Sequence, residues 1–318
     1  MSKQPLKPIS KARFVAGVIA ALALTPSLAH AANATWSGAT SGNWSETTNW
    51  SASPVPGTGD TATFNATSSN TTLDLGSGVT ISTLLFDTAN AAAYTIGSGG
   101  AGSQTLTLNN SGAITRESTV TNNELINANL TLGNATAGTY TVTNNGTTGS
   151  ITLAGAISGA IGGAKTLNIR GNGTTNITGN VSLGSATGLT LNIIGNSNST
   201  ISGRITGNVA VTQSLGSSTG AIGSLTLNND ANDFTGRFSA QGAYGAKVFF
   251  TSIADFGIAS ALGQGTAGTT ISLSNAHLVY TGAASSSSNR TWTGTNGNVI
   301  ENSSATGVLS LSGNFEQT

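Results

Sequence analysis

The most compact group of charges in this 318-residue chain is the stretch NDANDFTGR, which contains Asp230, Asp233 and Arg237. Carboxylates that bind Ca²⁺ beside a basic side chain would suit the cleavage of a polysaccharide. Calcium takes about six to eight oxygen ligands, so two carboxylates are too few unless neighbouring segments supply more. An Asp in a turn also commonly accepts hydrogen bonds from backbone N–H groups. We therefore interpret Asp230 and Asp233 as turn residues rather than as a calcium or catalytic site.

The second candidate for chemistry is His277, in the stretch SLSNAHLVYTG. The other histidine, His30, lies in the N-terminal leader described below. A lone histidine excludes a multi-histidine metal site and would have to carry any Ser-His-Asp triad by itself. Because His277 follows an alternating apolar pattern, we expect a structural or exposed strand residue rather than a general base.

Three arginines are candidates for surface features. Arg116 and Glu117 are adjacent, and we interpret them as a solvated surface pair. Arg204 and Arg237 each follow a glycine in similar stretches, and stacking would make a weak basic corner. The sequence thus predicts no catalytic, cofactor-binding or metal-binding residues and no cofactor.

Residues 1–31 have the organisation of a secretory signal peptide. A basic region precedes the apolar stretch 14–24, which is too short to span a bilayer, and the small-x-small sequence AHA ends at Ala31. The basic residues are Lys3, Lys7, Lys11 and Arg13. We expect Sec export into the periplasm and a mature chain that starts at Ala32. Its destination would be the surface of the outer membrane or the extracellular space.

The charges of the mature chain argue against nucleic-acid binding. Without the four basic residues of the leader, 7 basic residues remain against 11 acidic ones. Clustered Lys and Arg side chains are needed to displace the counterions of a nucleic acid, and the remaining seven are scattered along the chain. No nucleic-acid partner is expected.

The rest of the composition predicts paired strands. Residues 57–318 contain no proline, which lacks the N–H donor that a central strand needs. Only 7% of residues are charged and 37% are hydrophobic, which is unlike a disordered chain. Apolar and polar residues alternate in short segments such as TLTLNN (105–110) and SITLAG (150–155), and turn-forming Asn and Gly follow them. The chain is cysteine-free, so hydrogen-bond ladders and packing must hold it together.

A return of the sequence after 24 residues distinguishes a β-solenoid from a β-sandwich. TLNIRGNGTTNITGNV (166–181) is followed by TLNIIGNSNSTISGRI (190–205). In a solenoid, equivalent residues of successive coils stack. We therefore expect Leu167 over Leu191 and Ile169 over Ile193 in the interior, with Asn168 over Asn192 as an amide ladder. A third copy at 226–238 arrives after 36 residues, so this interval holds an inserted loop or part of another coil.

Trp36, Trp44 and Trp50 lie near the start of the mature chain. Flat aromatic rings could stack on sugars. The first coil of a solenoid also exposes an unpaired strand edge and an open core that something must cover. We favour a role for the three tryptophans as a cap over the first coil. The chain is accordingly divided into a signal peptide (1–31), a cap region (32–66) and a β-helical region (67–318), which we expect to be truncated at its C-terminal end.

The stretch SLTLNNDANDFTGRFSAQG (224–242) resembles the autotransporter-associated β-strand repeat. Residues 260–314 are similar to the segment on the C-terminal side of this repeat in large proteins of the same group. The tryptophan-rich start also matches their N-terminal region. The resemblance implies an all-β, right-handed parallel β-helix, the passenger of a type V secretion protein. An outer-membrane translocator is expected but is not found in this chain.

Two functions remain open from the sequence. The first is a non-enzymatic surface or secreted adhesin or structural stalk, with host or environmental glycans or surface proteins as partners. The alternative is a solenoid that degrades or binds polysaccharide. Because the 11 acidic residues are mostly isolated along the chain, we favour the first.

Overall fold

A computed structural model describes residues 1–2, 32–133, 136–184, 187–195, 198–214, 223–242, 247–295 and 297–317. The predicted signal peptide, apart from its first two residues, lies outside this range. Residues 31–318 form one compact unit. In its described residues the only helical element is the single 3₁₀ turn η1 (Thr47–Asn49), so the all-β prediction is confirmed.

The strands form three sheets in which every pair of neighbouring strands runs parallel. The first sheet contains β1 (Ala34–Thr35), β2 (Thr61–Phe64), β4 (Val79–Phe86), β6 (Thr105–Arg116), β8 (Asn129–Leu132), β9 (Gly138–Asn144), β11 (Ile157–Gly159), β12 (Lys165–Gly171), β14 (Val181–Gly184), β15 (Leu189–Ile194), β17 (Ile205–Thr206), β18 (Val209–Ser214), β20 (Phe238–Gln241), β22 (Ile271–Ser274), β25 (Trp292–Gly294) and β28 (Phe315–Gln317). The second contains β3 (Thr72–Leu73), β5 (Thr95–Ile96), β7 (Glu124–Ile126), β10 (Ser150–Leu153), β13 (Thr174–Ile177), β16 (Asn198–Ile201), β19 (Ser224–Leu227), β21 (Lys247–Phe250), β23 (His277–Tyr280) and β26 (Val299–Asn302). The third pairs β24 (Ser286–Ser288) with β27 (Leu309–Leu311).

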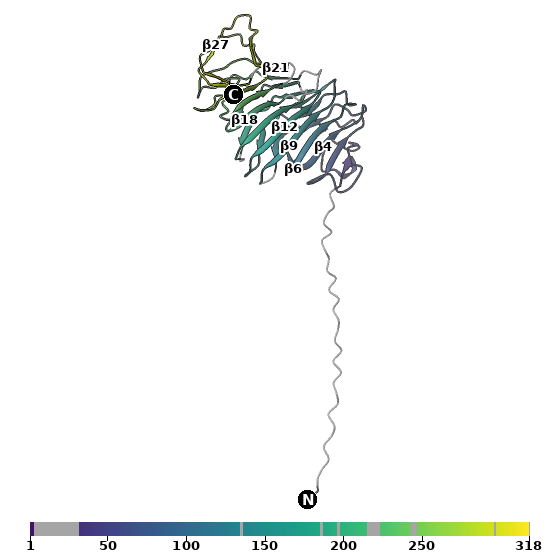
Figure 1. Ribbon diagram of the computed structural model, residues 1–318. Coiled ribbons are helices and arrows are strands. Elements are labelled where there is room, and N and C mark those ends of the chain that lie inside the picture. Colours follow the sequence, from purple (N-terminus) through teal and green to yellow (C-terminus); the bar gives the residue numbers. More distant parts are fainter. Residues whose placement is uncertain are drawn as a thin grey trace. The chain divides into compact units, whose positions relative to one another are not determined.

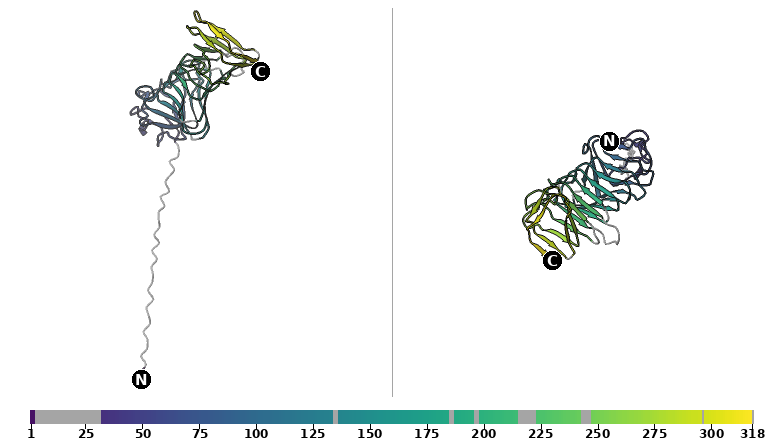
Figure 2. Two further views of the ribbon diagram at one scale, coloured as in Figure 1. Left: turned by 90° about the vertical axis from the view of Figure 1, so that its left-hand side faces the viewer. Right: turned by 90° about the horizontal axis from the view of Figure 1, so that it is seen from above.

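The long strand β6 belongs to two faces of the winding. Its first half pairs with β8, and its second half pairs with β9. Strands of the first sheet therefore follow two directions from β6, one through β8, β11, β14 and β17 and the other through β9 to β28. The second sheet supplies a further face. Strands from successive coils lie side by side along the axis, and their colours follow one another in chain order (Figures 1 and 2). The fold is a parallel β-solenoid.

The register predicted from the 24-residue return is confirmed. Leu167 pairs with Leu191 and Ile169 with Ile193, and all four side chains are fully buried. Asn168 pairs with Asn192, whose side-chain amide donates to the Oδ1 atom of Asn168 at 3.1 Å. The chain returns to the same sequence because it returns to the same position in the next coil. The right-handed sense of the winding stays a prediction.

The third sequence copy begins on a different face from the first two. Leu227 pairs with Ile201 in the second sheet, whereas Leu191 pairs with Val211 in the first. Of the two alternatives for the 36-residue interval, the strand pairing supports part of another coil. A similar local sequence can form strands on two faces, because strands on either face need the same alternation of inward apolar and outward polar residues.

Side chains from all faces fill the interior. Most inward columns are aliphatic, such as Ile126, Leu153, Ile177, Ile201 and Leu227 in the second sheet, and each of these is almost completely buried. Such burial contributes about 1.5–3 kcal/mol for each large aliphatic side chain. The repeated coils thus build one continuous core from a short repeating pattern.

Candidate functional site

The three N-terminal tryptophans form a closed aromatic cluster. Trp36, Trp44 and Trp50 are 0%, 3% and 6% exposed, and their rings meet edge to face at 5.0 Å and 4.7 Å between centroids. Phe64 packs against all three rings, and Phe86 stacks on Phe64 at 5.3 Å. The cluster therefore covers the core at its N-terminal end, as predicted, and a sugar-stacking platform with exposed rings is excluded.

The indole N–H groups of the cap are all bound to backbone carbonyl groups. Trp36 donates to Asn70 at 3.0 Å, Trp44 to Pro56 at 2.9 Å and Trp50 to Trp44 at 2.8 Å. The rings are consequently fixed, because a buried indole needs a partner for its N–H group.

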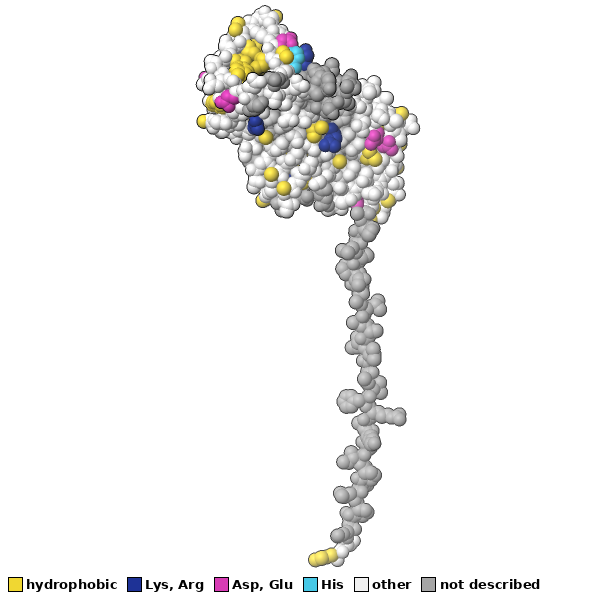
Figure 3. Space-filling view, viewed as in Figure 1, with side chains coloured by type: hydrophobic (Ala, Val, Ile, Leu, Met, Phe, Trp, Pro, Cys, Tyr) yellow, Lys and Arg dark blue, Asp and Glu magenta, His cyan; other side chains and the backbone are white. Residues whose placement is uncertain are grey.

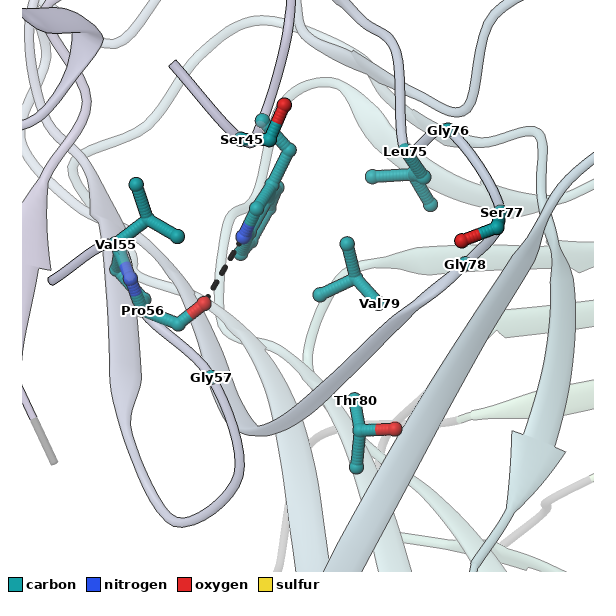
Figure 4. A pocket seen from close by; sticks show the side chains of 11 residues that line it. Ser45, Val55, Pro56, Gly57, Leu75, Gly76, Ser77, Gly78, Val79 and Thr80 are labelled. Atoms are coloured by element: carbon teal, nitrogen blue, oxygen red, sulfur yellow. Dashed lines mark hydrogen bonds between the residues drawn. The ribbon is translucent and has the colours of Figure 1, made fainter. Parts of the chain in front are cut away.

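A hollow of about 360 Å³ lies beside the cap, between the loop 55–57 and the turn 75–80. Figure 4 shows Val55, Pro56, Leu75 and Val79 around it, with the indole of Trp44 donating to the Pro56 carbonyl group. Its lining has no titratable side chain among the described residues. These described residues therefore supply no side chain that could act as a general acid or base.

His277 lies at the start of β23, as the sequence predicts, with its side chain 22% exposed. Its Nε2 atom is 2.8 Å from Glu301 Oε2, and the Lys247 ammonium group is 3.9 Å from the same oxygen. The hydroxyl group of Ser303 and the imidazole of His277 lower the pKa of Glu301. The three side chains form a surface cluster across three coils, in which Lys247 and Glu301 are an ion pair. A non-catalytic role for His277 stays a prediction.

Asp230, Asp233 and Arg237 do not converge on one site. Asp233 forms an ion pair with Arg204 of the preceding coil, whereas Asp230 accepts hydrogen bonds from Thr251 and Ser252 of the following coil. Burial alone would raise the pKa of Asp233, but hydrogen bonds from Thr206 and Arg204 lower it below its ordinary value.

The basic corner considered for Arg204 and Arg237 is not formed. Arg204 lies beside Asp233, whereas the carbonyl group of Arg237 accepts a hydrogen bond from the amide of Val211 on another face. The two similar stretches fall at different places in the coil, for the same reason that the third sequence copy changes face.

The interpretation of Arg116 and Glu117 as a solvated surface pair is wrong. Arg116 is fully buried at the end of β6. Its guanidinium group donates hydrogen bonds at 2.5–3.1 Å to the Oδ1 atom of Asn144 and to the carbonyl groups of Val120, Asn122 and Thr148. The alternation of β6 contained the signal, because Arg116 lies two residues after the inward Ile114. The carbonyl groups of two successive corners satisfy the buried cation.

The sequence analysis also missed the burial of other titratable side chains, among them Lys165, Arg290 and Glu124. Lys165 donates to the carbonyl groups of Thr136, Gly162 and Gly163, and Arg290 donates to those of Leu262 and Gly263. Burial lowers the pKa of Arg290 to about 10. Glu124 is 1% exposed, and burial raises its pKa to about 8 against the opposing effects of the Tyr94 amide and the Arg116 charge. The sequence could have indicated this burial, because Glu124 lies two residues before the inward Ile126 and therefore shares its face of β7.

The burial of several cations also explains why few Lys and Arg side chains lie on the surface. Arg116, Lys165 and Arg290 bind carbonyl groups inside the fold, while Arg204 and Lys247 face carboxylates. Lys and Arg side chains accordingly show as separate spots on the face in Figure 3. Nucleic-acid binding needs clustered cations, and the lack of a nucleic-acid partner stays a prediction.

Within the described ranges, there is no group of three or more His, Cys, Asp or Glu side chains suited to a metal ion. The same ranges contain no helix with the length and apolar character needed to cross a membrane. The charged side chains on the described surface lie singly or in small groups, such as the pair of Arg204 with Asp233 and the pair of Lys247 with Glu301.

The strand pairing of the described residues defines a parallel β-solenoid. The chain is 32% identical over 281 residues, 80% of its length, to the protein named adhesin BmaC autotransporter from Brucella suis biovar 1 (strain 1330). It spans only 7% of that protein's length. No family model matches the chain, and no solved structure matches it. The chain is thus a homologue of an autotransporter adhesin, and the predicted resemblance to autotransporter proteins is confirmed.

Proposed function

We propose that this chain is part of the passenger of an autotransporter adhesin, a non-enzymatic solenoid presented on the outer-membrane surface or in the extracellular space. The observation that carries the proposal is the homology to an autotransporter adhesin over 80% of the chain. The parallel winding supports it, because stacked coils make a long rigid surface from a simple repeat.

The absence of enzymatic activity is part of the proposal. Acid–base catalysis on a polysaccharide would need convergent carboxylates or bases. In the described part of the chain, the candidate side chains do not converge. Asp230 accepts a hydrogen bond from Thr251, Asp233 pairs with Arg204, and His277 contacts Glu301. A polysaccharide-degrading solenoid is therefore the less favoured function.

We further propose Sec export, with cleavage after Ala31, a cap of residues 32–66 and a passenger region of residues 67–318. The partners would be host or environmental glycans or surface proteins. An outer-membrane translocator would be needed for display.

The test is surface display in a non-adherent bacterial host, with the chain joined to an autotransporter translocator. Bacteria with the chain should attach to epithelial cell layers or matrix-coated plates more than bacteria with the translocator alone. N-terminal sequencing of the exported protein should begin at Ala32. Equal attachment on every surface would contradict the adhesin function, and release of reducing ends from a panel of polysaccharides would contradict the non-enzymatic one.

A further inference from the structure

A second hollow, of about 320 Å³, lies at one edge of the second sheet. It is formed by turns that follow three consecutive strands of this sheet, β19, β21 and β23. Because parallel neighbours end at the same edge, residues from three coils meet there, namely Asp230, the pair 251–252 and the segment 280–286. The hollow is small compared with ligand pockets in general, which measure about 300–1,000 Å³. It has room for a small ligand group.

Among the described residues of the lining, Asp230 is the only charged side chain, and neighbouring hydroxyl groups orient its carboxylate. Its Oδ1 atom accepts hydrogen bonds from the hydroxyl groups of Thr251 at 2.6 Å and Ser252 at 2.7 Å. Asp230 is exposed, and both of these hydrogen bonds end on its Oδ1 atom. One carboxylate oxygen is thus fixed while the other is free to accept a hydrogen bond from a ligand.

The floor of the hollow is closed and rigid. Tyr280 is fully buried, and its hydroxyl group donates to the carbonyl group of Ala284. A Cβ atom at Gly282 would lie 1.9 Å from the Thr251 carbonyl oxygen, so the turn packs directly on the preceding coil. A rigid site loses little conformational entropy when it binds a ligand.

We propose that this hollow binds one ring of a neutral saccharide through the carboxylate of Asp230. The inference rests on the proposed adhesin function and names a site and a ligand class for it. A sugar ring presents adjacent hydroxyl groups, which donate to a carboxylate in strong, charge-assisted hydrogen bonds. The hydroxyl groups of Thr281 and Ser285 add polar positions around it.

The charge of the lining selects against acidic sugars. No Lys, Arg or His side chain is present among the described residues of the hollow. A sulfate or carboxylate group on the ligand would meet Asp230 without a compensating cation and would be repelled. Since Tyr280 is buried, its ring face is not available for stacking, and a single site is expected to bind weakly. Multivalent ligands are the appropriate probes, because linked sites raise the overall affinity without new contacts.

The experiment screens the purified chain against immobilised neutral hexose and N-acetylhexosamine oligosaccharides and their sialylated or sulfated counterparts. Binding should be confined to neutral glycans and should persist in EDTA. The variant Asp230→Asn should weaken it by about tenfold or more, as expected for the loss of a charged hydrogen bond. Ala283→Tyr places a large side chain at the exposed Ala283 of the lining and should also abolish binding. Circular dichroism should show both variants folded.

Glu316→Gln is the matched control, because this exposed carboxylate lines a different hollow, together with Gly294, Thr295, Gly297 and Asn298. It should bind like the unmodified chain. Loss of binding in Glu316→Gln but not in Asp230→Asn would move the site elsewhere and overturn the proposal. Preference for acidic glycans, or binding that needs added Ca²⁺, would also overturn it. Normal attachment of displayed Asp230→Asn to cells would reject this site alone, whereas no attachment by the unmodified chain would reject the adhesin function itself.

Discussion

The buried carboxyl group of Glu124 makes the stability of the solenoid depend on pH. Glu124 faces the interior of β7 in register with Ile151. Its Oε2 atom accepts a hydrogen bond from the Tyr94 amide at 2.9 Å, whereas Oε1 is buried without a hydrogen-bond partner among the described residues. Of the charged groups, Arg116 acts on it most directly and favours its ionised form. Burial outweighs these effects and raises its pKa from 4.5 to about 8.

The sign follows from the protons bound in each state. Between pH 4.5 and 8 the folded chain keeps the proton on Glu124 while the unfolded chain has released it. Raising the pH through this window therefore lowers the free energy of unfolding, and above the folded pKa the loss levels off. A shift of this size corresponds to about 5 kcal/mol at about 1.36 kcal/mol for each pKa unit.

The variant Glu124→Gln keeps the size of the side chain and removes the titration. It should resemble the unmodified chain near pH 5 and become progressively more stable than it up to pH 9, by up to about 5 kcal/mol. A constant cost from the unpaired amide would leave this slope unchanged. Glu117→Gln controls for the exchange of a nearby carboxylate that is partly exposed.

Urea unfolding at several pH values should be followed by circular dichroism, together with hydrogen exchange of the Tyr94 amide. The exchange measurement reports the opening of this coil, since parts of a repeat protein can open separately. The reasoning would be refuted if the difference in the free energy of unfolding between Glu124→Gln and the unmodified chain did not change from pH 5 to pH 9.

The other predictions concern the winding and the cap. Leu191→Asp should lower the free energy of unfolding by more than about 4 kcal/mol, because it places a charge in the core, whereas Thr190→Asp on the outer face should be nearly neutral in urea unfolding. Gly203→Ala should destabilise the chain, since its Cβ atom would lie 1.9 Å from the Gly179 carbonyl oxygen, whereas a Cβ atom at Gly188 would meet open space. The midpoint of thermal unfolding should therefore be lower for Gly203→Ala than for Gly188→Ala. All four tryptophans are buried, so acrylamide should quench their fluorescence poorly until the chain unfolds, and strong quenching of the folded chain would contradict the closed cap.

The sequence by itself determined the class of fold and much of the register. Alternation of apolar and polar residues, the long proline-free region and the 24-residue return are all carried by residues close together in the chain. A repeat of this kind predicts both the inward columns and the stacking of Leu167 on Leu191, which the strand pairing confirms. The need to cover the first coil likewise predicted the tryptophan cap.

Only the tertiary structure decided where the charged residues lie. The alternation of β6 places Arg116 inward, but its burial is tolerable because Asn144 and the Thr148 carbonyl group of the next coil accept its hydrogen bonds. Those partners are 28 and 32 residues away. Asp230 and Asp233 are three residues apart in sequence, yet one faces the next coil and the other the previous coil. Coils of unequal length remove any fixed spacing between such partners, so local sequence shows which side chains are charged, and the stacking of the coils decides which groups they meet.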